Sequence, residues 1–219
     1  MNNLWAFGCS ETFGLWLPDT CQMDDDGVCL NPPSKYAWPQ ILSDKLNLNC
    51  INKGVGGNSN KGILQNVIEN INEISKNDIV CIQWSHIIRT NVYTNSGKNM
   101  IINSFAVDAD GKRMLQLDKE KDEIMKAYES YVVSIDYVKT FVEDLYIYID
   151  YLNLKLDCNI YHFIVQHMYK PPSWTTAKIL STNSIRESYP KAIDNIHTGT
   201  QGHAAIAEEY YKHIIKEIE

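Results

Sequence analysis

The stretch LWAFGCSETFG, residues 4–14, contains the transition that decides the fold. Its first four residues are apolar and Gly8 ends the run, which is typical of a short buried strand. A polar turn with a serine at position 10 follows directly. Strands that are apolar on both faces occur in sheets covered by helices on both sides, so this stretch indicates an α/β protein.

Further apolar runs alternate with amphipathic segments along the rest of the chain. We expect strands at about 4–7, 48–52, 78–84 and 160–166, and helices at about 35–46, 62–74, 124–152 and 200–218. This alternation predicts a three-layer α/β/α sandwich with a mainly parallel central sheet, of the flavodoxin-like kind.

Two segments depart from this alternation. Two semi-apolar arms around DADGKR predict a hairpin or excursion at about 98–120. Apolar residues from 124 to 152 alternate by four and three, which predicts a helix of roughly 34 residues, about 50 Å long. We interpret it as a crossover helix packed on the sheet. The alternative is that its far end, within 121–154, forms a homo-oligomer contact.

Composition and charge exclude several classes of protein. The 219 residues are 44% hydrophobic and 21% charged, as in an ordinary globular protein, and we expect one domain over 1–219. No apolar run approaches the roughly 18–20 residues of a membrane span. A net charge of −7 gives no attraction to nucleic acid or anionic lipid, so we expect neither as a partner.

We also expect no metal, no cofactor and no signal peptide. The six cysteines lack C-x2-C spacing, and the turns DDDG at 24–27 and DADG at 108–111 lack the calcium-loop spacing. The start MNNLWAFG has neither a basic region nor a long apolar one, which predicts cytoplasmic synthesis without a leader.

Chemistry-bearing residues follow each predicted strand, where ligands bind in such sheets. GCSETFG follows the first strand, NKGVGGNSN (52–60) the second and SHIIR (85–89) the third, while DNIH (194–197) precedes the last helix. A serine, a glycine-rich turn and an Asp-x-x-His are therefore expected at one edge of the sheet. These are the components of an acyl-transfer site: nucleophile, oxyanion donors, base and orienting carboxylate.

Each of the three candidate catalytic residues also has an ordinary structural interpretation. Ser10 would be the nucleophile, but a serine at a strand-to-helix turn commonly caps the helix. His197 would be the general base and Asp194 would orient it, but the pair could equally be a surface histidine and a turn-forming aspartate.

These blocks resemble the SGNH (GDSL-type) hydrolase superfamily. GCSETFG matches its G-D-S-x-T-x-G block with Cys9 in the Asp position, and Asn52, Gly54 and Gly57 match N-x-G-x-x-G. The resemblance implies the SGNH hydrolase fold, a triad of Ser10, Asp194 and His197, and oxyanion donors from the backbone of Ser10 and Gly57. With the W-S-x3-R stretch at 84–89, the chain is most similar to SGNH-like proteins of phages and bacteria. A viral source would make virion association the expectation.

The third block of the family departs, because no Asn follows the third predicted strand. Ser85, His86 and Arg89 after this strand, or Asn58 and Asn60 in the neighbouring turn, are the candidates for the missing oxyanion donor. His86 and Arg89 could instead grip a substrate. Three tryptophans in or near the loops at this edge could stack on a sugar, or could simply be packing: Trp16, Trp84 and Trp174.

The resemblance implies a serine esterase that removes a small acyl group, often acetyl, from a carbohydrate or lipid. The substrate would then be a small-molecule or glycan ester. The departure in the third block keeps an alternative open, a catalytically weakened or inactive binding or structural module. A weaker alternative is a flavodoxin-like binding protein without a triad.

Overall fold

The five-stranded central sheet is entirely parallel. The computed structural model describes residues 2–20, 31–87, 89–93, 99–102, 126, 130, 137–165 and 170–218. Five strands lie in the order β2-β1-β3-β6-β7. Their bounds are β1 Asn3–Gly8, β2 Asn49–Gly54, β3 Ile79–Trp84, β6 Asn159–Ile164 and β7 Leu180–Ser181.

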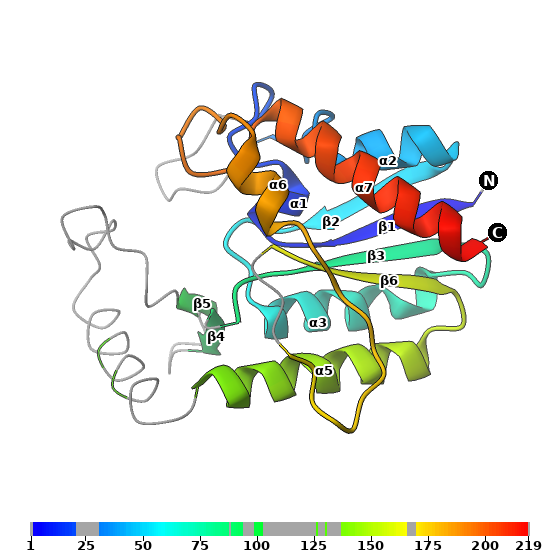
Figure 1. Ribbon diagram of the computed structural model, residues 1–219, viewed down its shortest axis with the longest axis vertical. Helices are drawn as coiled ribbons and strands as arrows, with labels where there is room; N and C mark the ends of the chain where they lie inside the picture. The colour runs from blue at the N-terminus through cyan, green and yellow to red at the C-terminus, as the bar shows by residue number, and fades with distance from the viewer. Residues whose placement is uncertain are drawn as a thin grey trace.

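Helices cover both faces of the sheet, which confirms the predicted α/β/α sandwich. Helices α2 and α7 lie on one face and α3 and α5 on the other, while α1 and α6 lie at the carboxyl ends of the strands (Figure 1). Their bounds are α1 Ser10–Phe13, α2 Trp38–Leu46, α3 Asn60–Asn70, α5 Tyr137–Lys155, α6 Asn183–Ser188 and α7 Thr200–Ile218.

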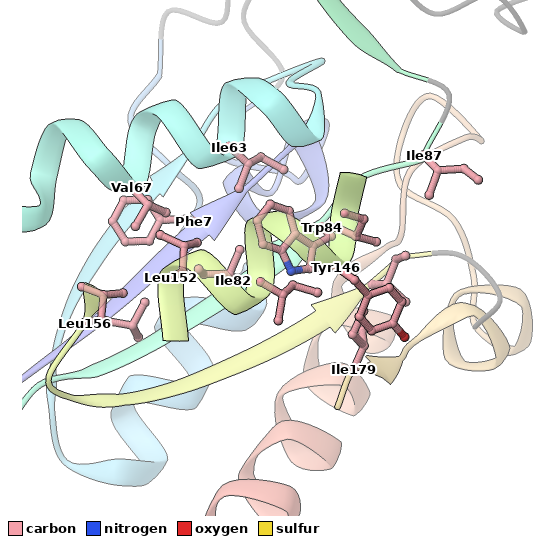
Figure 2. Packing of buried hydrophobic residues seen from close by; sticks show 14 of the residues in the cluster. Phe7, Ile63, Val67, Ile82, Trp84, Ile87, Tyr146, Leu152, Leu156 and Ile179 are labelled. Atoms are coloured by element: carbon pink, nitrogen blue, oxygen red, sulfur yellow. The ribbon is translucent and has the colours of Figure 1, made fainter. Parts of the chain in front are cut away.

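Two apolar clusters join these three layers. Strand β1 contributes to both because its successive side chains point to opposite faces: Trp5 and Phe7 pack in the cluster under α3 and α5, and Leu4 and Ala6 in the cluster under α2 and α7. Figure 2 shows the first cluster, in which Phe7 packs with residues of α3, α5 and β3. Burial on both faces explains why the strand reads as a continuous apolar run.

Several predicted boundaries shift. Helix α2 begins at Trp38, three residues after the predicted start, with Pro39 in its first turn, where a missing N–H costs nothing. Helix α3 begins at Asn60, where the Ser59 side chain accepts a hydrogen bond from the Gly62 N–H, and a 3-10 turn over Ile71–Glu73 follows it. The segment from 167 to 194, predicted to be a loop, contains β7 and α6, so that prediction was wrong there.

The expected excursions are only partly described. Strands β4 (Thr90–Tyr93) and β5 (Asn99–Ile102) pair antiparallel. The rest of the predicted hairpin, the two Asp-rich turns and most of 121–136 lie outside the described residues. Among the helices that the structure describes, none is long and apolar enough to cross a bilayer.

Candidate active site

Ser10 lies at the first turn after the central strand β1. It is the first residue of α1, follows the extended Cys9, and is 6% exposed. The turn is tightly packed, because a Cβ on Gly8 would overlap the Thr12 side chain and come within 2.9 Å of the Gln83 carbonyl oxygen. The backbone around Ser10 therefore has little freedom to move.

The end of β2 is joined directly to this turn. The Asn52 side-chain amide donates to the Thr12 carbonyl at 2.7 Å, and its oxygen accepts from the Gly54 N–H at 2.9 Å. A Cβ on Gly54 would overlap the Phe13 amide nitrogen and lie 2.9 Å from the Thr12 carbonyl carbon. Asn52 and Gly54 thus hold the glycine-rich loop against the nucleophile turn.

The structure brings Ser10, His197 and Asp194 into one hydrogen-bonded chain. His197 Nε2 lies 2.9 Å from Ser10 Oγ, and His197 Nδ1 lies 2.6 Å from Asp194 Oδ2. Because a carboxylate can only accept, Nδ1 carries the proton and Nε2 accepts from the serine hydroxyl. That tautomer is the one a general base requires.

Local hydrogen bonds fix Asp194. Its Oδ1 accepts from the backbone N–H groups of Ile196, at 3.1 Å, and His197, at 3.0 Å. Partial burial works to raise the pKa of Asp194, but the hydrogen bonds from the His197 ring and from these two N–H groups outweigh it and hold the pKa below its ordinary value. Asp194 is therefore a carboxylate at neutral pH.

The predicted oxyanion donors lie at the same edge, after β2 and β3. The Asn60 side-chain oxygen accepts from the Ser85 N–H at 2.7 Å. The Arg89 guanidinium donates to Ser85 Oγ at 3.1 Å and to the Asn58 carbonyl at 3.4 Å. Gly57 adopts a left-handed φ of 75° in the turn between β2 and α3. Arg89 thus connects the two loops, a role that the sequence did not predict.

The three tryptophans named above differ in how deeply they are buried. Trp84 is fully buried in the core and donates to His162 Nδ1 at 3.2 Å, so its prediction as a substrate-stacking residue was wrong. It is the last residue of β3, and its side chain points into the layer under α5 (Figure 2). Trp174 is exposed and lines a pocket with Asp150 and His213, without any triad residue. Trp16 is half-buried.

Two buried polar groups near the nucleophile turn were not predicted from the sequence. Glu11 forms an ion pair with Arg186 of α6, with 2.9 Å between Oε1 and Nη2. Gln83 accepts from Thr12 Oγ1 at 3.0 Å and from the Trp38 indole at 3.1 Å, and donates to the Tyr210 hydroxyl at 2.9 Å. Gln83 therefore joins α1, α2 and α7 to the sheet. Polar residues inside apolar strands are the signal that could have identified it.

Neither a metal site nor a further cysteine role emerges from the described residues. They contain no group of three or more His, Cys, Asp or Glu side chains placed to hold a metal ion. Cys9 is buried beside Ser10, and Cys81 lies in the core under α2 and α7. His86 is half-buried after β3, at the same edge as Ser10.

Comparison with solved structures finds proteins of similar fold at low sequence identity. One neighbour is an acetyl xylan esterase from the rumen bacterium Butyrivibrio proteoclasticus, 11% identical with a TM-score of 0.54, matched over 99% of this chain and 64% of that chain. The chain thus spans less than two thirds of that neighbour. Another is a carbohydrate esterase whose active site is described as displaying divergent catalytic and non-catalytic binding functions. It is 10% identical with a TM-score of 0.51, and the match covers 97% of this chain and 68% of that chain.

A third neighbour is described as a lipolytic protein of the G-D-S-L family from Desulfitobacterium hafniense. It is 12% identical with a TM-score of 0.41, and the match covers 97% of this chain and 99% of that chain. The sequence matches no protein-family model and no curated protein. At these identities the likeness concerns the fold alone, an α/β/α sandwich around a parallel sheet. The closer similarity to phage proteins stays a prediction.

Proposed function

We propose that this protein is a serine esterase that removes a small acyl group, and that its substrates are acetyl esters of carbohydrates. The observation that carries the proposal is the continuous chain from Ser10 Oγ through His197 to Asp194, with contacts of 2.9 and 2.6 Å. The fold shared with an acetyl xylan esterase supports the substrate class.

In this mechanism Ser10 Oγ attacks the ester carbonyl carbon while His197 Nε2 takes the hydroxyl proton. Asp194 stabilises the imidazolium that forms. The tetrahedral intermediate collapses, the alcohol leaves with the proton from His197, and an acyl-enzyme remains on Ser10. His197 then activates a water that releases the acid and regenerates Ser10.

The developing oxyanion needs preorganised donors. We propose the backbone N–H groups of Ser10 and Gly57 and the side-chain amide of Asn60. The Asn60 oxygen is held by the Ser85 N–H, which fixes the plane of the amide, and within the described residues its nitrogen has no protein partner. Ser85 is a weaker candidate, since its hydroxyl is buried and accepts from Arg89. The Asn58 side chain has no comparable anchor in the described part of the chain.

Labelling with a fluorophosphonate probe and hydrolysis of p-nitrophenyl acetate test the proposal. Wild type should label and hydrolyse the ester, and Ser10→Ala should lose both, with a rate loss of at least about 10⁴. Cys9→Ala is the matched control, because the buried Cys9 thiol next to Ser10 is the other group that the probe could label. This variant should still be labelled. Faster release of acetate from acetylated xylo-oligosaccharides than hydrolysis of long-chain esters would support the substrate class.

The alternative is an SGNH-like binding module without activity. It is favoured by one observation, that Ser85, His86 and Ile87 follow β3 where the family resemblance places an Asn. Wild-type protein that is folded, remains unlabelled and releases no acetate from pH 5 to 9 would contradict the esterase proposal and favour this alternative.

A further inference from the structure

An ion pair is buried directly behind the triad, and the mechanism above makes no use of it. The Glu11 side chain is 3% exposed and that of Arg186 is 16% exposed, with 2.9 Å between Oε1 and Nη2. Burying two charges is expensive, and such a pair often contributes little net stability. Its place beside the reacting groups therefore suggests a role in their chemistry.

The pair connects the two halves of the site. Glu11 follows Ser10 in α1, and Arg186 belongs to α6, the short helix before the loop that carries Asp194 and His197. Arg186 also donates to the Val165 carbonyl at 3.2 Å, just beyond the end of β6. Arg186 Nε makes no hydrogen bond in the described part of the chain, and the Thr198 side chain lies at the Glu11 carboxylate.

The charged and titratable groups of this region come from four elements. Asp194 contacts His197 from its own loop, and the exposed Lys191 of that loop donates to the Arg186 carbonyl. Glu11 on α1 faces Arg186 on α6 and His203 on α7. His203 accepts from the Trp38 N–H through Nδ1, so Nε2 carries a proton and faces Glu11 Oε2 at 3.9 Å.

The charge states of these groups follow from their burial. Burial lowers the pKa of His203 to about 4, so this ring is neutral at pH 7. Burial raises the pKa of Glu11, but the Arg186 guanidinium, the neighbouring His203 and His197 rings and the Thr198 side chain outweigh it and hold the pKa below its ordinary value. Glu11 directly follows Ser10, whose hydroxyl contacts the His197 ring, so the charges of Glu11 and of its partner Arg186 lie close to that ring.

We propose that Glu11 and Arg186 are positioning residues that balance the electric field at His197 and thereby set the pH at which it becomes a base. This inference rests on the proposed esterase function. The carboxylate favours the imidazolium and the guanidinium disfavours it, so the two charges act on His197 in opposite directions.

Removal of one charge at a time tests the proposal. Glu11→Gln leaves the cation unopposed, disfavours the imidazolium and should move the acidic limb of kcat/KM to lower pH by at least about half a unit. Arg186→Gln leaves the anion unopposed and should move the limb to higher pH. The double variant removes both charges and should return close to wild type, and it should melt at a higher temperature than Glu11→Gln, which buries an unpaired charge.

A purely structural pair would lower kcat in all three variants and leave the limb in place, which would overturn the proposal. Shifts of the same sign in both single variants would overturn it too. If one single variant does not fold, the other single variant and the double variant still test the sign. Glu208→Gln, which breaks the surface pair with Lys45, is the matched control and should not move the limb.

Titration of the His197 ring by NMR provides a readout independent of turnover. The same shifts should appear there, with the resonance assigned by its loss in His197→Asn. If the protein has no esterase activity but the His197 titration still shifts in opposite directions in the two single variants, the proposed function is wrong and the coupling holds. If the protein is active and the titrations do not shift, the function holds and the coupling is wrong.

Discussion

The nucleophile turn and the loop carrying the base meet at the hydrogen bond between Ser10 and His197, but different forces hold them. Ser10 is 6% exposed, and adjacent backbones leave no room for a Cβ at Gly8 or Gly54. The loop from 189 to 199 exposes Ile193 by 60% and Ile196 by 50%. Its conformation depends on local hydrogen bonds, such as that from the Ala192 N–H to the His197 carbonyl at 2.8 Å.

This difference implies that the two halves should respond differently to mutation. A position defined by close packing loses stability when it is changed, because the neighbours cannot move away. A position defined by a few exposed hydrogen bonds loses geometry at the reacting atoms with little effect on the fold. The predictions below test this contrast.

The largest effect is expected in the exposed loop. Asp194→Asn keeps an oxygen for the backbone N–H groups but cannot stabilise the imidazolium or impose the tautomer, so kcat should fall by about 10⁴ with the melting temperature nearly unchanged. Steady-state kinetics and thermal denaturation measure the two quantities. Asp150→Asn, away from the triad, is the control. A large loss of stability in Asp194→Asn would contradict the contrast.

An intermediate effect is expected at the oxyanion position. Asn60→Ala should lower kcat by about 10² to 10³ with KM little changed, the usual cost of one oxyanion donor. Asn58→Ala is the matched control, two residues away and similarly buried, and should stay within tenfold of wild type. A reversed order of the two variants would move the assignment to Asn58.

The packed half should respond in stability. Gly54→Ala places a methyl against the backbone of Thr12 and Phe13, and we expect a loss of about 1–3 kcal/mol or more in the free energy of unfolding. Gly56→Ala meets only the Leu15 side chain at 3.7 Å and should change stability little. Urea denaturation of both variants measures the difference. Equal stabilities would show that the turn can relax.

The smallest effect concerns the buried histidine behind this turn. The folded protein holds the pKa of His203 at about 4, whereas an unfolded histidine titrates near 6.5, so protons favour the unfolded state between these values. Stability should therefore fall as pH drops from about 6.5 toward 4. His203→Asn keeps an acceptor for the Trp38 N–H and should lose about 2 kcal/mol less than wild type between pH 7 and 5.

Much of the fold could be predicted from local pattern. Apolar runs marked four strands of the sheet, and the last helix begins and ends where it was predicted. The two-residue β7 and six-residue α6 were missed because they are too short to show a period. The prediction that Trp84 contacts substrate was wrong because Trp84 is a residue of β3, not of the loop that follows. Side chains alternate between the two faces of a strand, and the Trp84 side chain points into the core.

The sequence by itself determined the strand-turn context of Ser10, the Asn-x-Gly spacing and the Asp-x-x-His, because these depend on residue type over a few positions. Only the tertiary structure decided which side chains meet: His197 with Ser10 across 187 positions, and Arg186 with Glu11 from a helix without a sequence signal. The physical reason is that burial, hydrogen-bond partners and the electric field at a site arise from segments distant in the chain, and spacing along the chain does not encode them.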